Sequence, residues 1–227
     1  MLRIKNVTKT FGDVVALESI SFDVEKGDFI FLVGPSGSGK TTLIKLILKE
    51  LTPDTGEILL DKEDITKLPD EEIPYLRQRI GVVFQDFKVL PERTLRENIE
   101  VALAVAEVDP GEWVKRVEHV LDLVGLSDKI EMFPAQLSGG ELQRASLARA
   151  LVVNPDFVLA DEPTGNLDWE TAEEIINLLD KINKEGKTVI VATHHKAIVD
   201  KMDKRKVELK KPAKKGKKEK KTKKENG

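Results

Sequence analysis

The glycine-rich run from Gly34 to Thr42 constrains the fold of this chain more than any other feature. Its residues, Gly-Pro-Ser-Gly-Ser-Gly-Lys-Thr-Thr, fit the pattern G-x-x-x-x-G-K-[ST]. The apolar run 29–33 leads into it, and 43–48 leads out of it with helical spacing. A strand that turns through glycines into a helix presents backbone N–H groups and the positive end of the helix dipole to an anion. This order of elements predicts a phosphate-binding loop.

We expect the whole loop to bind the phosphates of a nucleotide. Its candidate contacts are Gly34, Pro35, Ser36, Gly37, Ser38, Gly39, Lys40, Thr41 and Thr42. Lys40 is placed to reach the β- and γ-phosphates of ATP, and the Thr41 hydroxyl is placed to bind Mg²⁺. A glycine-rich turn that matches by chance is the alternative, and the flanking strand and helix patterns disfavour it. ATP and Mg²⁺ are therefore the expected ligands.

Strand and helix patterns alternate along the rest of the chain. Strands are predicted over 3–8, 19–24, 28–33, 57–60, 80–84, 157–160 and 187–192. Helical patterns run from 93 to about 153, with Pro110 at a helix start and Gly125 at a stop, and over 171–184 and 196–202. The alternation predicts an α/β protein with a mainly parallel sheet. The long helical stretch predicts a helical lobe inserted into it.

The composition excludes several classes of protein. A chain of 227 residues with 40% apolar and 34% charged residues suits one large domain or two closely joined lobes. No stretch approaches the roughly 18 apolar residues of a membrane-spanning helix, and the first residues lack the apolar core of a signal peptide. The chain has no cysteine, so disulfides and thiolate metal sites are excluded, which fits a cytoplasmic protein.

The net charge of −3 hides a basic C-terminal end. Residues 204–227 hold 13 Lys or Arg and 3 Glu, a local charge of +10, and the difference leaves −13 on the first 203 residues. We expect this Lys-rich end to be disordered or frayed. It is a solubilising extension, or it contacts anionic lipid headgroups at about 1 kcal/mol per Lys. Nucleic acid is not an expected partner, because the segment has no aromatic residue to stack on bases.

Two acids follow the apolar strand pattern over 157–160. Ligands collect at the carboxyl ends of parallel strands, so Asp161 and Glu162 are expected to face the phosphate loop. The Asp161 carboxylate suits Mg²⁺, which prefers oxygen ligands. Glu162 is then the natural residue to polarise the attacking water. A plain strand end is the alternative, and the phosphate loop upstream favours the catalytic interpretation.

The run Leu137-Ser-Gly-Gly-Glu141, followed by Leu-Gln-Arg, resembles the signature motif of ATP-binding cassette (ABC) ATPases. As a local pattern it is a capped helix start whose backbone amides form another anion cradle. The resemblance covers about 2–209. It implies a P-loop NTPase of the ABC ATPase fold, with a RecA-like core, an N-terminal antiparallel β subdomain and an inserted α-helical subdomain. The implied boundaries are 1–209 for the ATPase domain, about 90–154 for its helical subdomain and 210–227 for a basic tail.

The resemblance also implies a homodimer that forms on ATP binding. Two subunits would pair head to tail, and each would offer its signature residues to the γ-phosphate of the other. The nucleotide contacts expected from the signature are Ser138, Gly139, Gly140 and Glu141. Glu141 stands where the family more often has Gln. Such an interface is two-fold, with two ATP molecules as part of it.

The remaining candidate residues take their roles from the same resemblance. Gln85 resembles the Q-loop glutamine that senses Mg²⁺ and the attacking water, and His194 resembles the switch histidine that contacts the γ-phosphate. Asp168 resembles the D-loop aspartate that couples the two sites. Phe11 stands where an aromatic ring stacks on adenine. The expected catalytic residues are Glu162, His194 and Gln85, and the expected Mg²⁺ ligands are Thr41, Gln85 and Asp161. His195 stands where the family usually has Asp.

The segment 84–99 is where the choice of partner is expected to lie. Its pattern FQDF-x-x-L-x-x-RT-x-x-EN is similar to that of cell-division members of the family. In the family, the region after the Q-loop glutamine meets the membrane subunit. The resemblance implies a membrane permease partner, control of cell-wall hydrolases, and a place at the inner face of the cell membrane. Transport ATPases of the lipoprotein-release or macrolide-export type are the alternative, and Phe87 and Leu90 have a simpler alternative as core or helix-cap residues.

Overall fold

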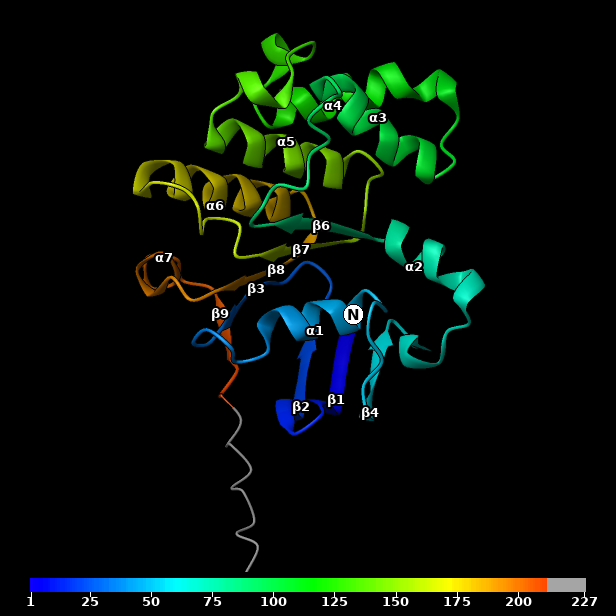
Figure 1. Ribbon diagram of the computed structural model, residues 1–227, viewed down its shortest axis with the longest axis vertical. Helices are drawn as coiled ribbons and strands as arrows, with labels where there is room; N and C mark the ends of the chain where they lie inside the picture. The colour runs from blue at the N-terminus through cyan, green and yellow to red at the C-terminus, as the bar shows by residue number, and fades with distance from the viewer. Residues whose placement is uncertain (212–227) are drawn as a thin grey trace, which may run out of the picture.

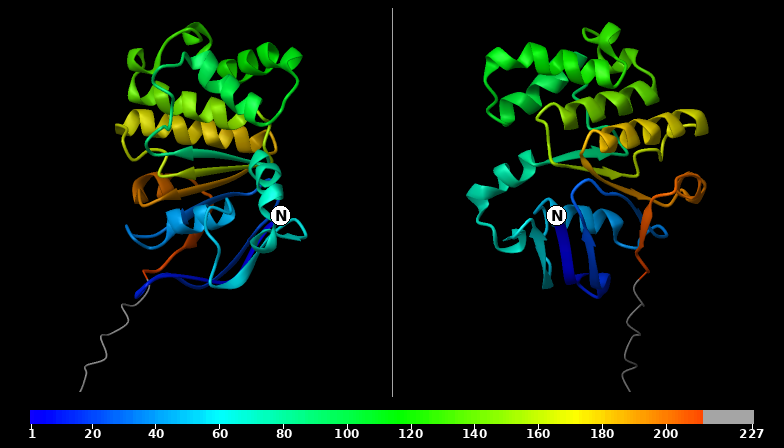
Figure 2. Two further views of the ribbon diagram at one scale, coloured as in Figure 1. Left: turned by 45° about the vertical axis from the view of Figure 1, so that its right-hand side comes forward. Right: turned by 180° about the vertical axis from the view of Figure 1, so that it is seen from behind.

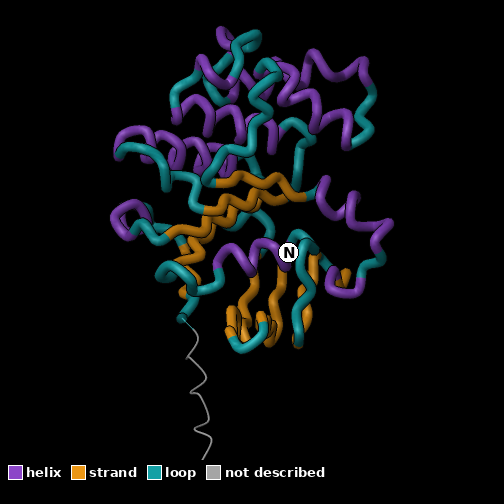
Figure 3. Tube along the Cα trace, viewed as in Figure 1, coloured by secondary structure: helices purple, strands orange, loops and turns teal. Residues whose placement is uncertain are grey.

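The computed structural model describes residues 1–211. The predicted tail lies outside the described residues from 212 onward. Across the described part, helices gather in an upper layer and strands in a middle and a lower layer, as Figure 1 and the secondary-structure colours of Figure 3 show. The stacking is the same in the two turned views of Figure 2. Within residues 1–211, no helix has both the length and the apolar character needed to cross a membrane.

The middle layer is a five-stranded sheet whose neighbouring strands are all parallel. Its strands, in spatial order, are β6 (Ile80–Phe84), β7 (Phe157–Asp161), β8 (Thr188–Thr193), β3 (Phe29–Val33) and β9 (Arg205–Glu208). The central strands are buried on both faces, which explains their unbroken apolar runs. This sheet confirms the α/β class expected from the alternating patterns.

The lower layer is an antiparallel sheet in the N-terminal part of the chain. Its strands, in spatial order, are β2 (Val14–Val24), β1 (Leu2–Phe11), β4 (Thr55–Leu60) and β5 (Glu63–Asp64). Helix α1 (Lys40–Ile47) contacts β2 on one side and β7 and β8 on the other. It lies between the two sheets in Figure 1. Its buried side chains therefore join both sheets into one apolar core.

The upper layer is the helical lobe. Its helices are α3 (Leu95–Val105), α4 (Trp113–Leu123) and α5 (Gly139–Leu151), and α6 (Trp169–Lys184) lies between them and the sheet. Helix α3 begins at a capping box formed by Thr94 and Glu97. Helix α4 follows a 3-10 turn that starts at Pro110, and it ends before Gly125, whose φ is +69°. The start and stop predicted from these two residues are confirmed.

Two short helices complete the fold. Helix α7 (Lys196–Lys201) matches the predicted helix over 196–202 to within one residue. Helix α2 (Ile73–Gln78) has no counterpart in the sequence prediction. It is only six residues long and has Pro74 in its first turn, so it is too short for a clear apolar period.

The start of the basic end was predicted wrongly. Residues 205–208 were expected to fray, but they form β9 on the edge of the parallel sheet, beside β3. Val207 packs on the lower core, and Leu209 is 1% exposed and donates its backbone N–H to the Val33 carbonyl over 2.8 Å. Apolar residues at alternate positions give this charged segment the period of a strand. The charge count alone concealed that period.

Candidate active site

Four neighbouring strands end at the same edge of the parallel sheet, and each delivers a candidate residue there. In the register, Phe84 lies opposite Asp161, Asp161 opposite Ala192, and Val33 opposite Thr193. The residues that follow the four strand ends are Gln85, Glu162, His194 and Gly34. Carboxyl ends of parallel strands meet at one edge, so segments far apart in the chain are brought together.

The phosphate loop connects β3 to α1 and needs its glycines. Gly39, the N-cap of α1, has φ +94°, and a Cβ there would lie 2.5 Å from the Ala16 carbonyl oxygen. Lys40 is 6% exposed, and its ammonium donates to the Gly34 carbonyl oxygen over 2.9 Å. The loop backbone therefore surrounds the Lys40 ammonium group, and the N-terminal end of α1 points at the loop.

Glu162 is the centre of a small charged cluster. Its Oε1 atom lies 3.2 Å from Lys40 Nζ and 2.9 Å from His194 Nδ1. Its Oε2 atom accepts the backbone N–H of His194 over 3.2 Å. Glu162 itself has φ +49°, a left-handed backbone that an L-residue adopts at a cost. Its backbone N–H donates to Ala192 over 2.8 Å, which anchors this turn to β8.

The pKa values of Asp161 and Glu162 are shifted in opposite directions. Burial raises the pKa of the Asp161 carboxyl, and the hydrogen bond from Thr41 opposes that rise only partly. Burial also acts to raise the pKa of Glu162, but His194 and Lys40 outweigh it, and the pKa is lowered. Glu162 is therefore an ionised carboxylate at neutral pH and is able to accept a proton.

Asp161 has the character of a cation ligand. Its Oδ1 atom is buried and has no hydrogen-bond partner within residues 1–211. A buried, unpaired carboxylate oxygen is costly unless a cation or a donor meets it. Thr41, which hydrogen-bonds the same side chain, adds a hydroxyl oxygen. Among the described residues there is no cluster of three or more His, Asp or Glu arranged around one point. This donor set fits Mg²⁺ that takes its other ligands from phosphate and water.

A hollow of about 380 Å³ lies over the phosphate loop. It is lined by Ser36, Gly37, Ser38, Gly39, Lys40, Thr41, Thr42, Gln85, Glu162 and His194. Residues 36–42 of the loop and the three residues expected to be catalytic thus share one space, whereas Gly34 and Pro35 line a neighbouring hollow. Phe11 is not among the lining residues. It ends β1, is 47% exposed, and has Lys9 Nζ 5.6 Å from its ring centroid.

Gln85 is bound by a reciprocal amide contact to the segment 166–168, which is called the D-loop below. Its Nε2 donates to Asn166 Oδ1 over 3.0 Å, and Asn166 Nδ2 donates to the Gln85 carbonyl oxygen over 3.1 Å. Gly165 leaves room for this contact, since a Cβ there would lie 2.8 Å from Gln85 Nε2. Asp168 closes the D-loop as the N-cap of α6 and accepts the Thr171 backbone N–H over 3.0 Å.

The signature residues begin α5. Ser138 is the N-cap, and Glu141 closes a capping box with it: the Ser138 backbone N–H donates to Glu141 Oε2 over 2.7 Å. Lys129 forms an ion pair with the same carboxylate. Lys129 and the Ser138 hydrogen bonds lower the pKa of Glu141 to about 2. The Glu141 side chain is therefore held in an ordered start of the helix.

A second hollow of about 380 Å³ lies over the signature and the D-loop. Its lining is Ser138, Gly139, Gly140, Arg144, Asn166, Leu167, Asp168, Thr171 and Glu174. None of these residues lines the hollow over the phosphate loop. Within one chain, the signature and the phosphate loop therefore open onto separate spaces.

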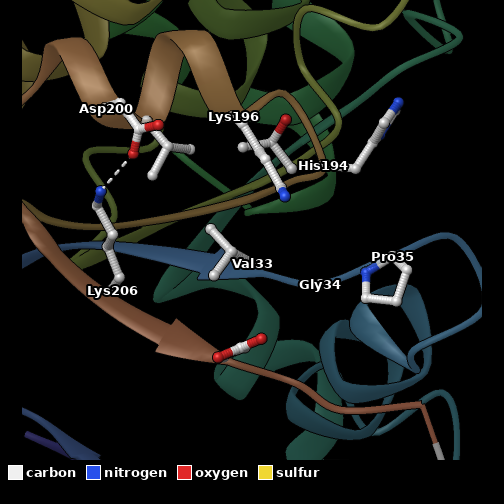
Figure 4. A pocket seen from close by; sticks show the side chains of 10 residues that line it. Val33, Gly34, Pro35, His194, Lys196, Asp200 and Lys206 are labelled. Carbon is white, nitrogen blue, oxygen red and sulfur yellow. Dashed lines mark hydrogen bonds and ion pairs between the residues drawn. The ribbon is translucent and has the colours of Figure 1, made fainter.

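A further hollow of about 480 Å³ lies beside the phosphate loop. Figure 4 shows it between the end of β3, the start of α7 and β9, with Pro35 and His194 on its rim. Lys206 on β9 pairs with Asp200 on α7 over 2.8 Å. Sequence reasoning missed this hollow, because it had no strand over 205–208.

Sequence reasoning also missed the residues that hold the segment after Gln85. Arg149 on α5 donates to the carbonyl oxygens of Lys88 and Phe87 over 2.6 and 3.2 Å. Asn98, 2% exposed, donates to the Leu90 carbonyl oxygen over 3.0 Å and accepts the Leu90 backbone N–H over 2.7 Å. The Leu90 side chain is 39% exposed, so the core alternative for it is wrong. Asn98 stands in the pattern quoted for this segment, but its burial and its contacts with Leu90 could be seen only in the structure.

Comparisons with known proteins agree with this geometry. Residues 17–165 match the family model described as ABC transporter. A Bacillus subtilis (strain 168) relative, the cell division ATP-binding protein FtsE, is 50% identical over 206 residues, covering 90% of this chain and 90% of the relative. A dimeric structure of the bacterial ABC transporter cassette MJ0796 has a TM-score of 0.83 at 39% identity, covering 93% of this chain and 95% of that chain. A post-hydrolysis dimer of the same cassette, bound to ADP and Pi, has a TM-score of 0.82 at 38% identity, with the same coverage.

Proposed function

Because this chain belongs to the ABC transporter family of ATP-binding cassettes, we propose that its ATP hydrolysis drives a membrane complex of cell division. The chain is an ATPase, which converts ATP and water to ADP and phosphate. One observation carries the assignment of its active site: Lys40, Glu162 and His194 form one charged cluster at the phosphate loop. The name of the Bacillus subtilis relative, a cell division ATP-binding protein, supports the cellular role.

The mechanism that this cluster supports is in-line attack of water on the γ-phosphorus. The water oxygen bonds to phosphorus while the bond to the bridging oxygen of ADP breaks. Glu162 takes the proton of the water, since its lowered pKa keeps it ionised. Lys40 and the loop N–H groups hold the β- and γ-phosphate oxygens. His194, fixed on Glu162, orients the water and contacts the γ-phosphate, and Gln85 positions the same water.

The proposed ligands of Mg²⁺ are Thr41, Asp161 and Gln85. The unpaired Oδ1 atom of Asp161 supports this assignment. When bound, Mg²⁺ neutralises charge on the phosphate oxygens. Phe11, exposed at the end of β1, is the proposed stacking surface for adenine.

We propose that two chains complete each site by pairing head to tail. The separate hollows over the phosphate loop and the signature support this arrangement, because within one chain no signature residue lines the hollow over the phosphate loop. In the dimer, Ser138 and Gly140 of one subunit meet the γ-phosphate held by Lys40 of the other. ATP then bridges two subunits, and hydrolysis removes the bridge.

The proposed partner is an FtsX-like membrane permease subunit. It would dock beside the segment 85–98, where a groove of about 480 Å³ lies between α2, α3 and α5. Arg149 lines this groove and donates to the Phe87 and Lys88 carbonyl oxygens. The same side chain therefore contacts both the proposed docking groove and the segment after Gln85. Val101 and Val105, 40% and 75% exposed, give the groove an apolar wall. Nucleic acid is not a proposed partner.

This partnership places the chain in the cytoplasm, peripherally on the inner face of the cell membrane. The Lys-rich tail supports the placement by its charge alone, since anionic lipid headgroups attract Lys near the surface. A transport ATPase of the lipoprotein-release or macrolide-export type would use the same chemistry with another permease. The identity of the co-purifying membrane subunit distinguishes the two.

The test uses the Glu162→Gln variant of the full chain. It keeps the size of the side chain but removes the proton acceptor, so it should bind ATP, nearly stop hydrolysis and accumulate as a dimer in size-exclusion chromatography with light scattering. Pull-down of this ATP-loaded variant from membranes should recover an FtsX-like permease. Glu118→Gln, on the exposed face of α4, is the control that should behave as the parent. A monomer with ATP would overturn the dimer, and recovery of a lipoprotein-release permease would overturn the cell-division role.

A further inference from the structure

Trp169 and His195 form a ring contact between the start of α6 and the loop that follows β8. The ring centroids are 5.7 Å apart and the planes are inclined by 42°. Trp169 is the first residue of α6 and directly follows Asp168 of the D-loop. His195 directly follows His194, whose ring and backbone both bind Glu162. The contact therefore joins the segment after the D-loop to the segment after the switch histidine.

The contact gives the D-loop a second attachment. At its start, Asn166 is bound to Gln85 by the reciprocal amide contact. At its end, Trp169 packs on His195. The D-loop therefore connects two parts of the active site. Its start contacts Gln85, and the residue after its end contacts His195, the neighbour of His194.

The surroundings of the two rings show what each contributes. The His195 backbone N–H donates to Thr193 Oγ1 over 3.1 Å, which fixes the main chain at the end of β8. Its Nδ1 atom is shielded from solvent and, within residues 1–211, has no hydrogen-bond partner. The imidazole thus acts as a packing surface at this position. Trp169 remains 44% exposed, so one part of its ring touches His195 and the rest is open on the molecular surface.

We infer that Trp169 and His195 are positioning residues that couple the D-loop to His194. The inference rests on the proposed function, in which the signature meets the other subunit, because the D-loop lines the same hollow as the signature. A shift of the D-loop on dimer closure is passed through the ring pair to the His194 loop, and so to the hydrogen bonds on Glu162. The aromatic pair supplies this connection.

The first test compares the kinetics of full-length variants. Trp169→Ala and His195→Ala should each lower kcat about 3- to 10-fold, the scale of an aromatic pair, and leave the KM for ATP within twofold. The double variant should lose no more than the larger single loss, because both changes remove one contact. Trp169→Phe, which keeps a ring, should recover most of the kcat. Tyr75→Ala, an exposed ring on α2 that is 67% exposed, is the matched control and should match the parent.

Additive losses in the double variant would overturn the inference, and so would an increase in KM with unchanged kcat. Thermal unfolding of each variant separates loss of coupling from loss of folding. A fully folded Trp169→Ala variant with parental kcat would also contradict it.

A fluorescence test needs no catalysis. The chain has 2 tryptophans, so a Trp113→Phe background leaves Trp169 as the single reporter. The emission of Trp169 should change when His195→Ala is added. In a Glu162→Gln protein, the emission should shift on addition of ATP only if His195 is present. Unchanged emission on loss of His195 would mean that the rings are not in contact. Failure of the proposed function would appear differently, as an intact ring contact in a protein that does not dimerise.

Discussion

Lys40 and Glu162 face each other across the phosphate loop, with Lys40 Nζ 3.2 Å from Glu162 Oε1. The cation proposed to bind phosphate and the carboxylate proposed to activate water thus form an ion pair with one another. Both are largely buried, at 6% and 15% side-chain exposure, so the contact is poorly screened by solvent. Phosphate oxygens have to take over Lys40 and thereby release Glu162 toward the water.

Replacing Lys40 by Ala should therefore lower nucleotide affinity strongly. Truncating one partner of a buried, hydrogen-bonded charge pair costs about 2–5 kcal/mol. Isothermal titration calorimetry with ADP and with ATP measures the loss, with Lys62→Ala, an exposed lysine in the turn after β4, as the control. Unchanged affinity would remove Lys40 from the phosphate site.

Replacing His194 by Ala should lower kcat about 10²- to 10³-fold, the usual loss when one group that stabilises charge in the transition state is removed. The change also removes the side-chain contact that lowers the pKa of Glu162, so that pKa rises. The acidic limb of the pH–rate profile should then move to higher pH. An acidic limb that stays in place would show that another group sets it.

Replacing Gly165 by Ala should displace Gln85 without unfolding the protein. The new Cβ would lie 2.8 Å from Gln85 Nε2, closer than real contacts allow, and the amide has to move. We expect kcat to fall about 10-fold or more, because small misplacements in an active site are costly. Gly111→Ala is the control, since its Cβ would meet only ordinary contacts, the nearest at 3.5 Å. Equal kcat in both variants would contradict the role of the Gln85 contact.

Replacing Glu141 by Gln should change the acid stability of the fold. The pKa of Glu141 is lowered from 4.5 to about 2, chiefly by Lys129 and then by the Ser138 hydrogen bonds. Its contribution is therefore present above about pH 4.5 and lost as the pH falls toward 2. At pH 7 the variant should melt about 1–3 °C lower, a modest shift because the pair is part-exposed. Below pH 4.5 the difference in melting temperature between the parent and the variant should shrink. Thermal melts across this pH range measure it, and a difference that stays constant would show that the charge of Glu141 does not matter.

Replacing Arg149 by Met should weaken binding of the membrane partner. The change leaves the Phe87 and Lys88 carbonyl oxygens without their donors, and both residues have left-handed backbones, with φ of 58° and 53°. The segment should lose its fixed shape, while the ATPase rate without the partner stays within about twofold. Pull-down of the permease should drop at least tenfold relative to Lys115→Met, an exposed lysine on α4. Equal recovery would place the docking surface elsewhere.

Local patterns were the part of the fold that the sequence could predict. The strand Ile80–Phe84 was found with its bounds because an unbroken apolar run lies between two polar residues, Arg79 and Gln85. The phosphate loop was equally visible, since glycines, lysine and threonine lie in one short run. Helix α6 begins two residues before the predicted 171, because its N-cap is Asp168 and Trp169 already belongs to the helix.

Contacts between distant segments were not predictable in the same way. Gln85 and Asn166 are 81 positions apart, and only the pairing of β6 with β7 brings them together. Trp169 and His195 meet because α6 and β8 pack on each other. Their residue types suggested no pairing, since an exposed Trp and a His have many possible neighbours.

The strand at 205–208 has a practical consequence for anyone who labels this protein. It carries the end of the described chain past the phosphate loop: Leu209 is held on Val33, and Lys211 Nζ lies 3.9 Å from where a side chain on Gly37 would begin. A dye attached at residue 211 would therefore lie beside the phosphate loop. Such a reporter is well placed to follow ATP binding, and the same position makes it a poor choice for a silent affinity tag.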